Sequence, residues 1–327
     1  MTSSVIDKIK AFLSSEGIEL EAEKFLTVVS NVYHRFEAEQ YDVSHDEIVL
    51  GEKYWQSTLA SIKELLPPKI RVLDIGCGTG FASEQVLNAY GSMVESIVCA
   101  DLSPDMAKQC RTRLEGRIGD GAWLAGSIRC LRKAPRFDLV ITNAMLHHVV
   151  DLQELLTTVA SLVKKGGFYV AGHEPGAAFY KSAELAAWTK RYRKYKKIKG
   201  MFSAGRWLRR LGLQPVPMDL DVETNRILLQ MGLINRPLPR GAVSRLVDVH
   251  VPPSSPAAPF WGEPGLDPTE LVRRYMRGFE LGSMATYSHI KDIGVQRSVL
   301  WRRLERVLAR RWPLEGADII FAARRVA

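Results

Sequence analysis

Short apolar runs alternate with helical patterns through the middle of this 327-residue chain. Residues 70–75 form an apolar run of the length expected for a buried strand, and Pro67 and Pro68 end the helical pattern before it. The other elements expected in this region are strands at 96–100, 137–142 and 168–171 and helices at 83–90, 104–114 and 152–163. This alternation predicts a parallel sheet with helices on both faces, whose ligands bind at the carboxyl ends of the strands.

The segments on either side differ from this pattern. Apolar residues at helical spacing before residue 66 predict an N-terminal helical cap. After Pro175 a long, basic, helical insertion reaches about residue 233, and a proline-dense loop follows at 251–268. Alternation then resumes, with helices at 268–276 and 298–311 and strands at 281–287 and 318–323. The predicted units are a cap (1–66), a core with strands one to five (67–175), a lid (176–266) and the rest of a seven-stranded α/β sheet (267–327).

Composition and cysteine usage narrow the class of protein. A hydrophobic share of 46% and a charged share of 25% are typical of a globular chain. The four cysteines show no C-x-x-C spacing, and no apolar stretch reaches the ~18 residues of a membrane span. We therefore expect a cytoplasmic protein without a secretion signal, a transmembrane segment or a metal site.

A glycine-rich turn follows the first predicted strand. Asp74 precedes three alternate glycines, Gly76, Gly78 and Gly80, in the run VLDIGCGTG. Glycine permits positive φ and a close approach of the backbone to a ligand. A dinucleotide fingerprint needs G-x-G-x-x-G, but here the third glycine comes one residue early. A cofactor other than a dinucleotide is favoured, although the acid and the glycines can also simply cap and tighten a turn.

A second acid ends the second strand, 27 residues later. Asp101 is followed by Leu102, Ser103 and Pro104, so a carboxylate stands directly before a helix. Such a carboxylate can accept hydrogen bonds from both hydroxyls of a ribose. Ser103 and Pro104 suit the N-cap and first position of that helix, and both interpretations hold together.

These motifs resemble the class I S-adenosylmethionine-dependent methyltransferases, most closely the ubiquinone- and menaquinone-biosynthesis type. The resemblance covers residues 70–175 and includes the stretch FDLVITNAMLHHV at 137–149 and the turn KKGG at 164–167. It implies a Rossmann-like, doubly wound sheet that binds S-adenosylmethionine and releases S-adenosylhomocysteine. It places Asp74 near the methionyl amino group, Asp101 at the ribose and the glycines along the methionyl portion. The further cofactor contacts that it implies are Leu102, Met106, Ser127, Ile128, Asn143 and, from the cap, Tyr41.

Methyl transfer is an in-line displacement, so positioning supplies much of the rate, and a general base helps an acidic acceptor by ~10²–10⁴-fold. The candidate bases at strand ends are His147, His148, His173 and its neighbour Glu174, with His173 preferred. Alternatively, the first two histidines belong to a family-typical turn and Glu174 caps a neighbouring helix.

The acceptor is the open question. We expect a small organic molecule, anionic or aromatic, methylated on oxygen, nitrogen or carbon in metabolite or natural-product biosynthesis. Ala144 and Met145 stand where amino-methyltransferases of nucleic-acid bases carry two prolines, which argues against base flipping. A cofactor-binding regulator without activity and a homodimer both stay open.

The net charge of +9 is uneven, since residues 181–327 carry 27 lysines and arginines against 13 aspartates and glutamates. Seven of the ten residues at 190–199 are basic, and Tyr192 and Tyr195 lie between them. This run suits a solvated helix face, an anionic substrate, an acidic carrier protein or a membrane surface. The alternative function is therefore an RNA or protein methyltransferase that docks its substrate through residues 190–210.

Overall fold

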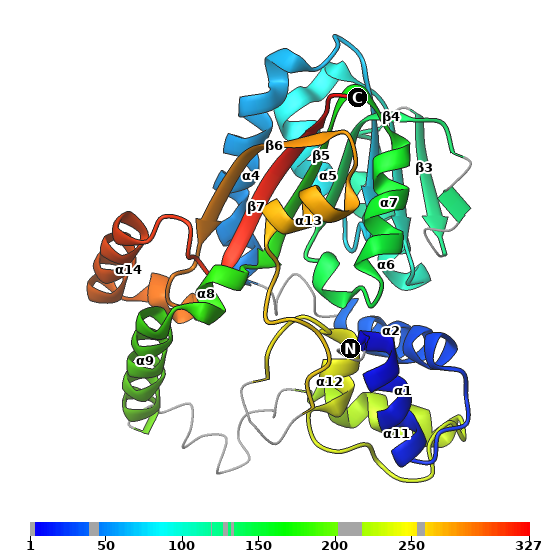
Figure 1. The fold of residues 1–327 in the computed structure, drawn as a ribbon, viewed down its shortest axis with the longest axis vertical. Helices are drawn as coiled ribbons and strands as arrows, with labels where there is room; N and C mark the ends of the chain where they lie inside the picture. Colours follow the sequence, from blue (N-terminus) through cyan, green and yellow to red (C-terminus); the bar gives the residue numbers. More distant parts are fainter. Residues whose placement is uncertain are drawn as a thin grey trace.

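A computed structural model of the chain describes residues 4–38, 46–118, 120–126, 130–131, 134–201, 218–253 and 259–327. Its centre is a seven-stranded sheet in the order β3-β2-β1-β4-β5-β7-β6 (Figure 1). The strands are β1 (Ile70–Ile75), β2 (Val94–Asp101), β3 (Asp120–Ala125), β4 (Phe137–Asn143), β5 (Val163–Pro175), β6 (Phe279–Tyr287) and β7 (Asp318–Arg325). The prediction of seven strands, five before the insertion and two after it, is confirmed.

One strand departs from the predicted parallel sheet. β7 lies between β5 and β6 and runs antiparallel to both, with Thr286 opposite Ile319 in the β6 pairing. The connection from β6 to β7 contains η5 (Ile293–Arg297) and α14 (Val299–Arg311). These helices pack beyond the end of the sheet instead of crossing a face of it, so the chain re-enters the sheet in the opposite direction.

Successive residues of each strand enter different cores, because side chains alternate across a sheet. Val72 and Ile141 face α4 (Asp46–Ile62), α5 (Phe81–Tyr90) and α6 (Pro104–Leu114). Leu73 and Val140 face α7 (Leu152–Leu162) and α13 (Pro268–Tyr275) on the other side. The apolar runs recognised in the sequence are therefore strands buried on both faces.

A third core forms beyond the carboxyl ends of the strands. It joins α1 (Val5–Ser15) and α2 (Ala22–Ala38) to α11 (Leu220–Gln230) and α12 (Ala242–Val247). Figure 1 shows these four helices together below the sheet. The predicted cap is thus divided: its first two helices meet the second half of the insertion, whereas α4 covers a face of the sheet.

The first half of the insertion packs elsewhere. The helices α8 (Ala177–Lys181) and α9 (Ala183–Met201) join α14 in a fourth core at the β6 side of the molecule (Figure 1). Tyr192 is buried there, while the basic side chains of residues 190–199 are exposed. Within the described part of the chain, no helix is long and apolar enough to cross a membrane.

Candidate functional site

A cavity of about 1530 Å³ lies at the carboxyl ends of the strands, between the sheet and the helical cap. The glycine turn and the start of α6 line one part of it, and the segment after β4 lines another. α2 and residues 246–251 of the insertion line it from the side opposite the sheet. Because ligand pockets commonly measure ~300–1,000 Å³, this volume can hold a cofactor together with an acceptor.

The glycine turn needs its glycines for two different reasons. Gly76 has a φ of +68°, and a Cβ there would lie 2.4 Å from Cγ of Met145. Gly78 has a φ of +51°, lines the cavity and would meet no atom within 4 Å with an added Cβ. Gly80 is the N-cap of α5, packs against Cys110 and lies away from the cavity wall. The turn therefore presents bare backbone at Gly78, where a ligand can approach closely.

Asp74 lies beneath this turn. Its side chain is completely buried, and Oδ2 accepts a 2.6 Å hydrogen bond from the Ser83 hydroxyl. Burial raises the pKa of Asp74 from 3.8 to about 7, although the Ser83 bond opposes the rise. Oδ1 has no hydrogen-bond partner among the described residues, so the carboxyl retains an unsatisfied acceptor. Its contact with the methionyl amino group stays a prediction.

Asp101 both organises the turn and faces the cavity. Its carboxylate accepts hydrogen bonds from the backbone N–H groups of Gly78 at 2.9 Å and Ser103 at 2.8 Å. Burial raises the pKa of Asp101, and these two N–H groups oppose that rise. A carboxylate has about four lone-pair sites, so two remain for ribose hydroxyls. Ser103 also caps α6 by accepting from Met106 N at 3.4 Å, as predicted, while ribose binding by Asp101 stays a prediction.

The other predicted cofactor contacts fall into two groups. Leu102, Met106 and Asn143 line the same cavity as the turn. Asn143 Oδ1 also accepts a 2.8 Å bond from the indole of Trp55 on α4, which fixes the end of β4. Tyr41, Ser127 and Ile128 lie outside the described residues. The residues present fit S-adenosylmethionine, because the cavity offers bare backbone at Gly78, the carboxylate of Asp101 and the apolar side chains of Leu102 and Met106.

Glu174 anchors the segment that carries the histidine pair. Its side chain is completely buried and lies outside the cavity lining. Oε1 accepts from Met145 N and Leu146 N at 2.8 Å each, and Oε2 accepts from His147 N at 3.2 Å. These N–H groups begin the short helix η4 (Leu146–His148), so Glu174 caps a helix, as the alternative interpretation had it. We interpret Glu174 as a positioning residue that does not touch the acceptor.

The same carboxylate orients His147, whose Nδ1 lies 2.8 Å from Oε2. Burial would raise the pKa of Glu174, but His147 and the backbone N–H groups outweigh it and lower the pKa. Burial and the neighbouring His148 lower the pKa of His147 despite Glu174. The neutral imidazole therefore donates Nδ1–H to an ionised Glu174, which leaves Nε2 with its lone pair.

His173, the preferred base, lines the cavity from the end of β5. Its φ is +56°, which is unusual for a residue with a side chain and turns it out of the regular strand. Nδ1 lies 2.9 Å from the hydroxyl of Tyr287, and that ring stacks on Tyr54 at 4.4 Å. Burial raises the pKa of Tyr287 well above 10, so its hydroxyl stays neutral and holds the imidazole by hydrogen bonding.

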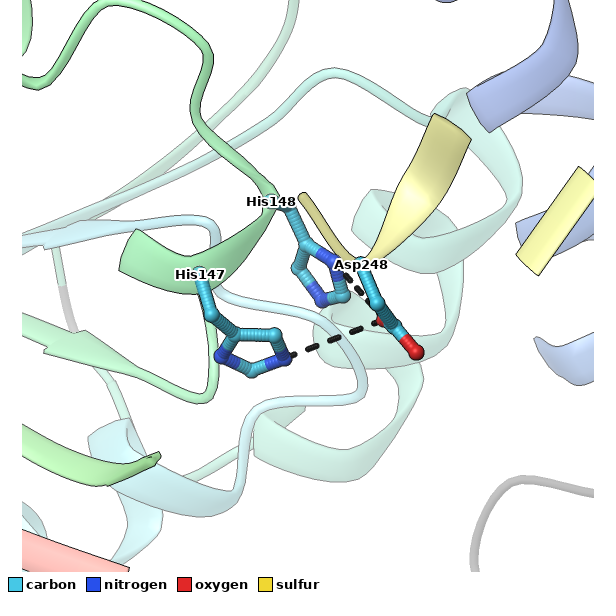
Figure 2. Close-up of side chains that lie close together, drawn as sticks. All are labelled: His147, His148 and Asp248. Atoms are coloured by element: carbon cyan, nitrogen blue, oxygen red, sulfur yellow. Dashed lines mark ion pairs between the residues drawn. The ribbon is translucent and has the colours of Figure 1, made fainter. Parts of the chain in front are cut away.

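The structure adds residues that the sequence did not single out. His34 of α2 lies edge-on to His148, with ring centroids 5.5 Å apart, and lines the cavity. Oδ1 of Asp248 lies 3.3 Å from His148 Nδ1 and 4.0 Å from His147 Nε2 (Figure 2). A hundred residues separate the histidine pair from Asp248, so no local motif could have linked them.

Sequence comparison agrees with the location of the site. Residues 72–167 match the family model described as a methyltransferase domain. The chain is 27% identical to malonyl-[acyl-carrier protein] O-methyltransferase 2 of Ilyobacter polytropus over 38% of its own length and 47% of that protein's. It is 34% identical to the ubiquinone biosynthesis O-methyltransferase of Coxiella burnetii over 29% of its length and 40% of that protein's. The matches thus span less than half the length of these relatives.

Solved structures align more widely but more loosely. An S-adenosylmethionine-dependent methyltransferase from Mesorhizobium loti shares 16% identity over 81% of this chain and 96% of that one, with a TM-score of 0.38. The assignment therefore rests on the sequence matches and on the observed strand order and glycine turn. Residues 72–167 match a methyltransferase domain, and the strand order and glycine turn are those of the class I S-adenosylmethionine-dependent methyltransferase fold, whose cofactor is S-adenosylmethionine.

Proposed function

We propose that this protein transfers the sulfonium methyl group of S-adenosylmethionine to a small organic acceptor in the cavity. One observation carries the proposal: the same cavity is lined by the predicted cofactor contacts Gly78, Asp101 and Met106 and by five imidazoles, among them those of His147, His148 and His173. The helices α1, α2 and α12 line this space from the side opposite the sheet, so an acceptor bound here is partly shielded from bulk water. An acceptor that fits such a space is a metabolite-sized molecule or the end of a longer one.

Two groups in the cavity suit acceptors that must lose a proton. Nε2 of His147 carries a lone pair, because Nδ1 donates to Glu174. His173 is the second candidate, because Nε2 is the acceptor in the tautomer whose Nδ1 donates to the Tyr287 hydroxyl. In the proposed reaction the acceptor atom forms a bond to the methyl carbon as the carbon–sulfur bond breaks. The acceptor's proton passes to an imidazole, and S-adenosylhomocysteine leaves.

The acceptor atom that these groups favour is oxygen. Imidazole bases suit hydroxyl, phenol or carboxylic acid acceptors near neutral pH. Two matched relatives are O-methyltransferases by name, which agrees with this choice. We propose O-methylation in metabolite or natural-product biosynthesis, with N- and C-methylation as the finer alternatives.

The alternative is an RNA or protein substrate docked on the basic face of α9. Its support is the exposed charge of residues 190–199 together with the exposed side chains of Tyr195 at 38% and Ile198 at 49%. Lys196 already pairs with Asp292 at 2.9 Å, so part of this charge is neutralised within the chain. An acidic carrier protein that delivers a tethered acceptor would suit the same face.

The test is transfer of radiolabelled methyl from S-adenosylmethionine into a host extract separated into small-molecule, protein and RNA fractions. Asp101→Ala is the inactive variant, and Asp105→Ala, an exposed aspartate four residues along, is its matched control. Label in small molecules with the wild type and the control, but not with Asp101→Ala, supports the proposal. Label confined to protein or RNA would replace it with the docking alternative.

A further inference from the structure

The cluster of His147, His148 and Asp248 lies at the cavity wall and takes part in none of the predicted cofactor contacts. Within the described ranges, it is the set of three or more histidine, cysteine, aspartate or glutamate side chains whose potential ligand atoms all lie within 4.8 Å of one another. We propose that these three residues bind a divalent transition-metal ion, and that the ion holds an oxygen donor of the methyl acceptor.

The spacing of the ligand atoms suits such an ion after small side-chain adjustments. A tetrahedral ion with bonds of ~2.0–2.1 Å places its ligand atoms roughly 3.3 Å apart. His148 Nδ1 lies 3.3 Å from Asp248 Oδ1, and His147 Nε2 lies 4.0 Å from the same oxygen. Figure 2 shows both rings directed at this carboxylate from the segment after β4. The two histidine nitrogens lie within 4.8 Å of each other, so the side chains must close this distance as well as the 4.0 Å one to complete the set.

Neighbouring side chains orient two of these ligands, His147 and Asp248, for metal binding. Metal-binding histidines almost always donate their other ring N–H to a carboxylate or carbonyl. His147 does so, with Nδ1 lying 2.8 Å from the buried Glu174. Arg245 binds Oδ2 of Asp248 at 3.0 Å, which leaves Oδ1 toward the histidines. The orientation expected of a metal site therefore exists before any ion binds. Because an ion at His147 Nε2 occupies that lone pair, His173 is the base that takes the acceptor's proton when the ion is bound.

His148 changes its tautomer in this proposal. Its Nδ1 also lies 3.1 Å from the backbone oxygen of Val247, to which it donates when Nδ1 is protonated. An ion at Nδ1 moves that proton to Nε2, and a neutral imidazole carries its proton on either nitrogen. The Val247 oxygen then loses this donor.

The ligand set indicates the kind of ion and its role. Two imidazoles and one carboxylate suit the borderline divalent ions from manganese to zinc, and a site with three protein ligands keeps an open position. All three residues line the cavity, so that position faces the space proposed for the acceptor. A hydroxyl, phenol or carboxylate oxygen there would be oriented by the ion. This second part rests on the proposed function, whereas metal binding itself does not.

The test is titration of the full, chelator-treated chain with Co²⁺, followed by its visible absorption and by competition with Zn²⁺. We expect one equivalent to saturate the signal and Zn²⁺ to displace it. Asp248→Asn and His147→Asn should each weaken binding at least about tenfold, and Glu174→Gln about 10–100-fold. Asp138→Asn is the control, because this aspartate pairs with Lys164 at the other end of β4.

Three results would overturn the proposal: no Co²⁺ absorption by the wild type, an unchanged signal in Asp248→Asn and His147→Asn, or an equal loss in Asp138→Asn. The titration of the wild type decides even if a variant fails to fold. Methyl transfer without any bound metal would leave the proposed function and metal binding standing and would refute only the ion's role in holding the acceptor.

Discussion

Glu174→Gln tests how a single buried carboxylate organises the histidine segment. The carboxylate accepts four hydrogen bonds, two at each oxygen, all from N–H groups of residues 145–147. A glutamine side chain keeps the shape but has one oxygen and one NH₂ group. In the least costly arrangement, the oxygen retains the two bonds to Met145 N and Leu146 N. The NH₂ group then faces His147.

The cost follows from this arrangement. The NH₂ group faces the backbone N–H of His147, and two donors cannot form a hydrogen bond. The bond from this N–H to the charged carboxylate, worth ~1.5–3 kcal/mol, is therefore lost. The two retained bonds become neutral and weaken by about 1 kcal/mol each, while removal of a buried charge offsets part of the loss. We expect a fall in the free energy of unfolding of about 2–5 kcal/mol. The NH₂ group also donates to His147 Nδ1, which forces the proton onto Nε2.

Urea denaturation measures the stability, and ¹⁵N NMR of the histidine side chains reports the tautomer. Glu280→Gln, on the exposed edge strand β6, is the control and should stay within ~0.5 kcal/mol of the wild type. A loss below about 1 kcal/mol, or a His147 ring that keeps its proton on Nδ1, would refute the assignment of Glu174 as the anchor.

Three further predictions concern the cofactor half of the cavity. Because the pKa of Asp74 is raised from 3.8 to about 7, this carboxyl ionises in the unfolded chain at a lower pH than in the folded one. Asp74 therefore lowers the stability by about 3 kcal/mol as the pH rises from 4 to 7. Urea denaturation of Asp74→Asn across this range should lack that slope, and equal slopes would contradict the raised pKa. Asp101→Ala should weaken S-adenosylmethionine binding by about 3–6 kcal/mol in calorimetry, through two lost charge-assisted bonds, while Asp105→Ala binds normally. Gly78→Ala should lower stability by roughly 1 kcal/mol and weaken the same binding at least about tenfold, because its methyl group projects into the cavity; an unchanged affinity would place the cofactor elsewhere.

The sheet and the cofactor half of the site were accessible from the sequence, because their signals are local. At Asp74 a strand, a carboxylate and a glycine turn occur within a few residues, and at Asp101 a strand ends in a carboxylate directly before a helix. The sequence therefore predicts both positions, and their contacts with the cofactor stay predictions. The reversed direction of β7 was not accessible. The direction of β7 depends on where η5 and α14 pack, and the order of strands and helices in the sequence does not determine this packing.

The histidine side of the cavity, where we propose that the acceptor binds, depends on contacts between distant segments. Glu174 anchors His147 from 27 residues away, and Asp248 meets the histidine pair from the far side of the insertion. The third core likewise joins α2 to α11 and α12 across about 200 residues of chain. Sequence patterns named the histidines but could not distinguish a base, a turn residue and a metal ligand, because that distinction lies in their neighbours.

We propose that the cofactor and the histidines share one cavity, and a crystal structure with S-adenosylhomocysteine bound would test this arrangement. We expect the ribose on Asp101, the methionyl chain along Gly76 and Gly78, and the sulfur directed at the space between His147 and His173. A cofactor whose sulfur faces away from these imidazoles, or which binds outside this cavity, would contradict it.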